Sequence, residues 1–125
     1  MSAKPKVLVV EDIPAEGALL RDALAAAGYS VVRARGMESG LLQARHEQPA
    51  LVLLDVHLPG QDGWEAVRRL KADPLTARIP AVVLTDVHPA RRVVHDSACD
   101  AWHGKPVAEA ELLVTVAELL GRRKS

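Results

Sequence analysis

The 125-residue sequence has few of the residues on which disulfide-bonded or aromatic-rich proteins depend. It contains one cysteine, Cys99, so no disulfide can form within the chain, and we expect a small buried apolar side chain at this position. A single cysteine also fits a reducing cytosol. Because the chain has two Trp, one Tyr and no Phe, its core must be built from Val, Leu, Ile and Ala.

Long apolar runs and net charge are also missing. No apolar run approaches the roughly 20 residues that a membrane-spanning helix requires. Near the N-terminus, Lys4, Pro5 and Lys6 interrupt any apolar signal-peptide core. The 16 basic and 16 acidic residues cancel to a formal net charge of zero, which provides no long-range attraction to nucleic acid or to an anionic membrane. We therefore expect a cytoplasmic protein without a nucleic-acid or membrane partner.

Strand and helix patterns alternate five times along the chain. Apolar, β-branched runs predict strands at 6–10, 30–33, 51–55, 81–85 and 101–103, and helical spacing predicts helices at 15–27, 37–47, 64–72, 89–98 and 108–120. Strands without polar alternation are typical of parallel sheets that helices cover on both faces. The pattern predicts an α/β fold, a doubly wound five-stranded parallel sheet in three αβα layers. We expect this fold to form one domain over 1–125, with the core of the domain at about 5–120.

Three residues add local detail to this predicted fold. Gly28 stands where the C-cap of the first helix belongs. Asp62 is placed to cap the third helix at its N-terminus. Trp64, early in that helix, is expected to be partly exposed and to take no part in chemistry.

Polar side chains gather where the predicted strands end. Glu11 and Asp12 follow the first strand, and Asp55 ends the third. Thr85 ends the fourth strand, and Lys105 comes soon after the fifth. Because ligands of open α/β sheets bind beyond the carboxyl ends of the strands, we expect these five side chains at one edge of the sheet.

The chemistry of this set favours phosphoryl transfer. Carboxylates that lie close together repel one another unless a cation is present. Oxygen ligands with room for water favour Mg²⁺ over zinc. A metal beside Asp55 would let its carboxylate attack phosphorus, while Lys105 and Thr85 hold the other phosphoryl oxygens. The product would be an acyl phosphate.

Four motifs carry a family resemblance: VVEDIP at 9–14, LVLLDVHLPGQDGWE at 51–65, IPAVVLT at 79–85 and CDAWHGKP at 99–106. With them the sequence resembles the receiver domains of two-component response regulators, of the chemotaxis-regulator type, over essentially its whole length. The resemblance implies a flavodoxin-like fold with strand order 2-1-3-4-5.

The same resemblance implies a metal site and a phosphoacceptor. Glu11 and Asp12 would organise Mg²⁺ (or Mn²⁺). Asp55 would be both a metal ligand and the residue that is phosphorylated. The backbone carbonyl of His57 would be a further metal ligand.

It also implies a switch. Thr85 would be the switch hydroxyl, and Trp102 occupies the position of the switch aromatic. Lys105 would bind a phosphoryl oxygen, and its bond to Pro106 is typically cis in the family. Asp86 departs from the pattern, since receivers usually carry a small residue directly after the switch hydroxyl.

The implied function is signalling rather than enzymatic turnover. A sensor histidine kinase or histidine phosphotransfer protein would donate the phosphoryl group. The chain would catalyse only its own phosphorylation and slow dephosphorylation, and it would be a monomer or a phosphorylation-dependent dimer. A downstream protein target would bind the face made by the fourth helix, the fifth strand and the fifth helix.

Two alternatives stay open. The chain could be an interaction module that works without phosphorylation, for which Asp86 is the only support. It could instead be a small Mg²⁺-dependent phosphatase of the haloacid-dehalogenase type. That chemistry normally needs a second acid two residues after the nucleophile, where this chain has His57.

Overall fold

The computed structural model describes residues 4–55, 61–85 and 99–124. In these ranges five strands and four helices follow one another: β1 (Lys6–Glu11), α1 (Pro14–Ala26), β2 (Ser30–Ala34), α2 (Met37–Glu47), β3 (Leu51–Asp55), α3 (Gln61–Ala72), β4 (Ala81–Thr85), β5 (Ala101–Gly104) and α5 (Glu109–Lys124). The predicted strands are confirmed to within a residue or so at each end. The helix predicted at 89–98 lies outside the described residues, as do His57 and Asp86.

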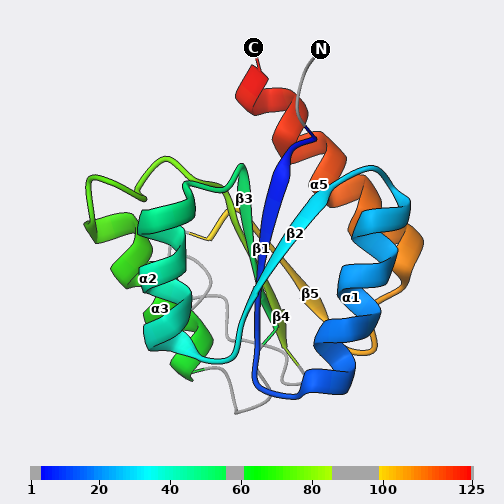
Figure 1. Ribbon diagram of the computed structural model, residues 1–125, viewed down its shortest axis with the longest axis horizontal. Coiled ribbons are helices and arrows are strands. Elements are labelled where there is room, and N and C mark those ends of the chain that lie inside the picture. The colour runs from blue at the N-terminus through cyan, green and yellow to red at the C-terminus, as the bar shows by residue number, and fades with distance from the viewer. Residues whose placement is uncertain (1–3, 56–60, 86–98, 125) are drawn as a thin grey trace.

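The five strands form one parallel sheet in the order β2-β1-β3-β4-β5. Helices α1 and α5 cover one face, and α2 and α3 cover the other (Figure 1). The doubly wound αβα architecture and the strand order are therefore confirmed. Every strand runs in the same direction, so all carboxyl ends reach the same edge of the sheet.

Alternating side chains on the strands divide the core into two layers. One layer packs the sheet against α2 and α3, and its buried sheet residues are Leu8, Val10, Ala34, Val52, Leu54, Ala81 and Val83. The other packs the sheet against α1 and α5, with Val7, Val9, Leu51, Leu53, Val82 and Leu84 from the sheet. Because β1, β3 and β4 bury both faces, their sequences are continuous apolar runs. No helix in the described part of the chain is long and apolar enough to cross a bilayer.

Several helix boundaries differ from the expectation, by one to four residues. Helix α1 begins at Pro14, where proline is tolerated because the first-turn N–H needs no partner within the helix. Helix α3 begins at Gln61, so Asp62 lies within the helix rather than at its cap. Helix α5 continues to Lys124, four residues beyond its expected end. The C-cap of α1 is Ala27, and Gly28 follows it with a φ of 99°, the left-handed conformation that commonly ends a helix.

The expected exposure of Trp64 was wrong. Its side chain is buried at 4% relative exposure and belongs to the core layer under α2 and α3, with Val67 and Leu70 of the same helix. These three positions follow the spacing of one helix face, which α3 turns to the sheet. Cys99 packs against the same layer, but it is only partly buried.

Candidate functional site

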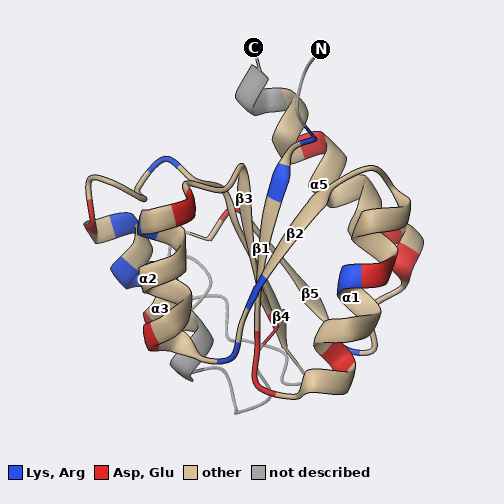
Figure 2. Cartoon of the chain, viewed as in Figure 1, with Lys and Arg blue, Asp and Glu red and all other residues tan. Residues whose placement is uncertain are grey.

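The expected site residues do meet at the carboxyl edge of the sheet. Glu11 and Asp55 are register partners at the ends of the neighbouring strands β1 and β3. Figure 2 shows acidic residues where β1 ends. Thr85 ends β4, and its carbonyl accepts a 2.8 Å hydrogen bond from the backbone N–H of Lys105. Pairing of β4 with β5 therefore places Lys105, directly after β5, beside Thr85, although the two residues are 20 positions apart in the sequence.

The central contact of the site joins Asp55 to Lys105. The Lys105 ammonium forms an ion pair with Oδ1 of Asp55. Asp55 is only 3% exposed, and the Lys105 side chain is 14% exposed. Burial raises the pKa of Asp55, and the charges of Glu16 and Asp12 act in the same direction. The hydrogen bond and the charge of Lys105 oppose this shift without cancelling it.

The same pair holds Lys105 in its charged form. Burial by itself lowers the pKa of Lys105. The hydrogen bond and the charge of Asp55, and then those of Glu16, more than offset burial and leave the pKa above its ordinary value. The site therefore presents a fixed positive charge next to a buried carboxylate.

Glu16 is a site residue that the sequence analysis missed. It lies in the first turn of α1, and its Oε1 is 3.2 Å from the Lys105 ammonium. An acid in a first helical turn is common, because it complements the helix dipole. Its position four residues after Asp12, at the start of the helix that follows a site strand, was the available signal.

Arg33 was also missed. One of its nitrogens, Nη2, donates to Oε1 of Glu11 at 3.1 Å and to the carbonyl of Pro14 at 2.9 Å. Glu11 is 1% exposed, so this guanidinium compensates a buried carboxylate. Arg33 comes from β2, on the far side of β1 from Asp55. Nothing in the linear spacing of the motifs pointed to it.

The expected metal ligands lie near one another, but their side chains do not form a complete coordination site. Glu11 faces Arg33, Asp55 faces Lys105, and Asp12 is exposed at the rim. Among the residues that the structure describes, no group of three Asp, Glu, His or Cys side chains is placed to hold a metal ion. Oε2 of Glu11 is buried without a hydrogen-bond partner in this part of the chain. Such an oxygen, with two nearby carboxylates, fits Mg²⁺, which keeps several waters and needs few protein ligands.

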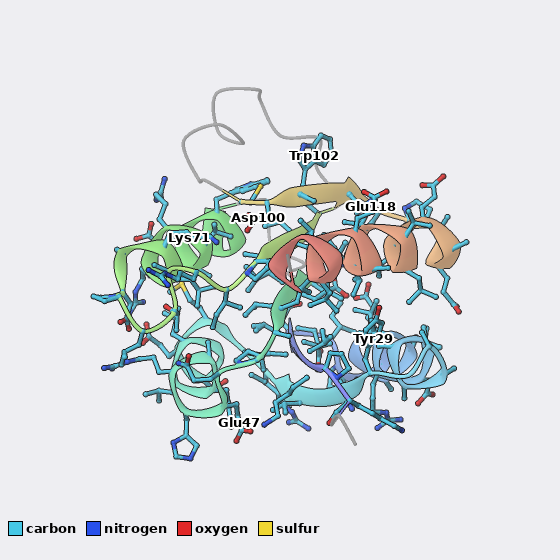
Figure 3. The ribbon with its side chains drawn as sticks, turned by 90° about the horizontal axis from the view of Figure 1, so that it is seen from above. Tyr29, Glu47, Lys71, Asp100, Trp102 and Glu118 are labelled. Atoms are coloured by element: carbon cyan, nitrogen blue, oxygen red, sulfur yellow. The ribbon has the colours of Figure 1, made fainter. Side chains whose placement is uncertain are left out.

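The two expected switch residues occupy different environments. Thr85 is 1% exposed at the end of β4. Trp102 is partly buried against the core layer under α2 and α3, and it stands out from β5 on the side away from α5 (Figure 3). The peptide bond between Lys105 and Pro106 is cis, as the resemblance implied.

A cavity of about 600 Å³ lies between α1 and α5 and opens onto the site. Asp55, Glu16 and Lys105 line its polar end. Its other walls are mainly apolar, with Leu19, Leu20, Leu84, Val107, Leu112 and Leu113 among them. The buried Asp55 is therefore reached from a groove rather than enclosed by the core.

Comparison with known proteins identifies the family. The model of the response regulator receiver domain matches residues 7–117. The polar-differentiation response regulator DivK of Brucella anthropi is 31% identical over 92% of this chain and 95% of its own. The transcriptional regulator RpaA of Synechocystis is 36% identical over 94% of this chain, and the response regulator PleD of Caulobacter vibrioides is 37% identical over 95%. The chain belongs to the response regulator receiver domain family.

Coverage of these relatives differs. The chain spans half the length of RpaA and about a quarter of PleD, but nearly all of DivK.

Solved structures agree on the fold. The receiver domain of the sensor histidine kinase PA1611 of Pseudomonas aeruginosa, solved with magnesium in its active-site cleft, superposes with a TM-score of 0.83. It shares 26% identity over 95% of this chain and 99% of its own. A CheY-like receiver domain of Methanospirillum hungatei has a TM-score of 0.87 at 24% identity, with 97% of each chain covered.

Proposed function

We propose that this chain is the phosphoacceptor receiver domain of a two-component or phosphorelay system, and that Asp55 is the residue that is phosphorylated. The observation that supports this best is a buried carboxylate at the end of β3 in contact with a charged Lys105, open to a groove. A carboxylate so placed is shielded from bulk water, and it has a cation beside it where charge would develop.

In this proposal the phosphoryl group passes directly from the donor to Asp55. An oxygen of Asp55 forms a bond to the phosphorus of a phosphohistidine donor, while the bond between phosphorus and the imidazole nitrogen breaks. The electron pair of that bond leaves with the imidazole of the donor. The Lys105 ammonium holds one phosphoryl oxygen, and the Thr85 hydroxyl, at the neighbouring strand end, binds another.

Mg²⁺ (or Mn²⁺) belongs to this proposal. Asp12 and Asp55, with Glu11 and the carbonyl of His57, would hold it, and the bound cation would supply screening of the negative charge on the incoming phosphoryl group. The neighbour from Pseudomonas aeruginosa carries magnesium in its own active-site cleft. This chain's own support is Oε2 of Glu11, which is buried without a hydrogen-bond partner among the residues that the structure describes.

Signalling would proceed through partner binding. A histidine kinase or a histidine phosphotransfer protein donates the phosphoryl group, and the new charge draws Thr85 toward it. Trp102 lies on β5, so a shift there would change the face made by β5, α5 and the fourth helix predicted at 89–98. The protein would act in the cytoplasm as a switch without an enzymatic product and without a nucleic-acid partner, as a monomer or a phosphorylation-dependent dimer.

The test is intact-mass measurement after incubation with acetyl phosphate or phosphoramidate and Mg²⁺. The wild type should gain the mass of one phosphoryl group, and Asp55→Asn should gain none. Asp22→Asn, which removes an exposed acid of α1, is the matched control and should behave as the wild type. A folded wild type whose mass stays unchanged with both donors would overturn the proposal and favour an interaction module that works without phosphorylation. Steady turnover of a generic phosphate ester would instead favour a phosphatase.

A further inference from the structure

The side chains of Glu16, Lys105 and Asp55 are joined in a row by two ion pairs, with Lys105 in the middle. Oε1 of Glu16 is 3.2 Å from the Lys105 ammonium, and the same ammonium pairs with Asp55. Lys105 is largely buried and Glu16 is about one-third exposed, so the contact is partly shielded from water. The two residues are 89 positions apart in sequence and come from α1 and from the segment after β5.

In this geometry the single ammonium of Lys105 forms ion pairs with two carboxylates, those of Glu16 and Asp55. A phosphoryl group on Asp55 would bring further negative charge to the same ammonium. The carboxylate of Glu16 would then lie near an anion of like charge, which electrostatic repulsion disfavours. Before phosphorylation, the same carboxylate adds to the negative charge that attracts a divalent cation.

We propose that Glu16 is a positioning residue that holds Lys105 in the unphosphorylated site, strengthening cation binding while opposing the phosphorylated state. The inference rests on the proposed function, because it concerns how easily Asp55 takes a phosphoryl group. It differs from a helix-dipole role for Glu16, since an acid that only complements α1 would change stability and leave ligand binding at the site unaltered.

Removing the charge of Glu16 should change the affinities for Mg²⁺ and for a phosphoryl mimic in opposite directions. Glu16→Gln removes the charge and keeps the shape of the side chain. At saturating Mg²⁺ it should tighten binding of beryllofluoride, an anionic mimic of the phosphoryl group, by roughly three- to tenfold. It should weaken binding of Mg²⁺ alone by about threefold. Both affinities can be measured by titration with tryptophan fluorescence or calorimetry, and initial phosphorylation rates with acetyl phosphate should rise with the beryllofluoride affinity.

Two further variants serve as controls. Glu109→Gln removes an acid from the first turn of α5 that lines the same cavity, so it matches Glu16 in helical position and charge. It should leave both affinities within about twofold of the wild type. Glu16→Asp keeps the charge but shortens the reach to Lys105. It should retain wild-type Mg²⁺ affinity and bind beryllofluoride with intermediate strength.

The outcomes separate this inference from the proposed function. A wild type that binds beryllofluoride, beside a folded Glu16→Gln variant that matches it or loses both affinities together, overturns the role of Glu16 alone. A wild type that binds no beryllofluoride and gains no mass overturns the proposed function and this inference with it. Thermal unfolding of each variant shows whether the fold is retained.

Discussion

Gly17 of α1 lies so close to the Glu11 side chain that a Cβ atom at position 17 would overlap the Cγ and Cδ atoms of Glu11. Glu11 is buried and held by Arg33, so it has little freedom to move away. The glycine therefore lets α1 approach the end of β1 where the acidic residues begin.

Gly17→Ala should consequently destabilise the protein by about 1–3 kcal/mol, the usual cost of overpacking. Alanine at a helical glycine otherwise stabilises by up to about 1 kcal/mol. Gly121→Ala in α5 is the control, because nothing lies within 4 Å of an added Cβ there. It should be as stable as the wild type or more so. Urea unfolding of both variants measures the difference, and a Gly17→Ala protein at least as stable as the wild type would refute the steric argument.

The ion pair between Arg33 and Glu11 should be asymmetric in its energetics. Arg33→Met leaves a carboxylate of 1% exposure without its cation and should cost about 1–3 kcal/mol in metal-free buffer. Glu11→Met should cost less, because Arg33 is 28% exposed and can turn to water. The double variant should recover part of the loss of Arg33→Met. A double-mutant cycle in urea with a chelator present measures the coupling, and strictly additive losses would contradict it.

Trp64 should be a major contributor to stability, contrary to what its sequence position suggested. Trp64→Ala removes a large side chain of 4% exposure from the layer under α2 and α3, with an expected cost of about 3–5 kcal/mol. Leu42→Ala, at a position 66% exposed, should change stability by less than about 0.5 kcal/mol. Thermal or urea unfolding compares the two. Similar small losses in both variants would show that Trp64 does not pack as described.

Glu38 of α2 should titrate below its ordinary range. Its hydrogen bond with Arg69 of α3, at 2.6 Å, and then the charge of that residue lower the pKa of Glu38. Because the folded pKa is depressed, the pair stabilises the fold above the unfolded pKa, and this contribution is lost as the pH falls through the folded value. Arg69→Met should move the NMR titration midpoint of the Glu38 carboxyl upward. Arg68→Met, which removes the partner of Glu65, should not; equal midpoints in the wild type and Arg69→Met would contradict the assignment.

Much of the fold could be predicted from the sequence because its signals are local. The apolar runs of β1, β3 and β4 and the helical spacing of α1, α2 and α5 show which segments are strands and which are helices. Parallel strands joined by helices then bring their carboxyl ends to one edge of the sheet. For that reason Asp55, Thr85 and Lys105 could be assigned to one site from their places after strands.

The sequence by itself thus determined the alternation of elements, the edge at which the site forms and the residue types available there. Only the tertiary structure decided which charges pair: Glu11 with Arg33, and Lys105 with both Asp55 and Glu16. Such pairings depend on how each helix is rotated and how closely it approaches the sheet, and these are set by packing of the whole core. The burial of Trp64 was decided in the same way, because a helix pattern shows an apolar face but does not show how far the neighbouring helix covers it.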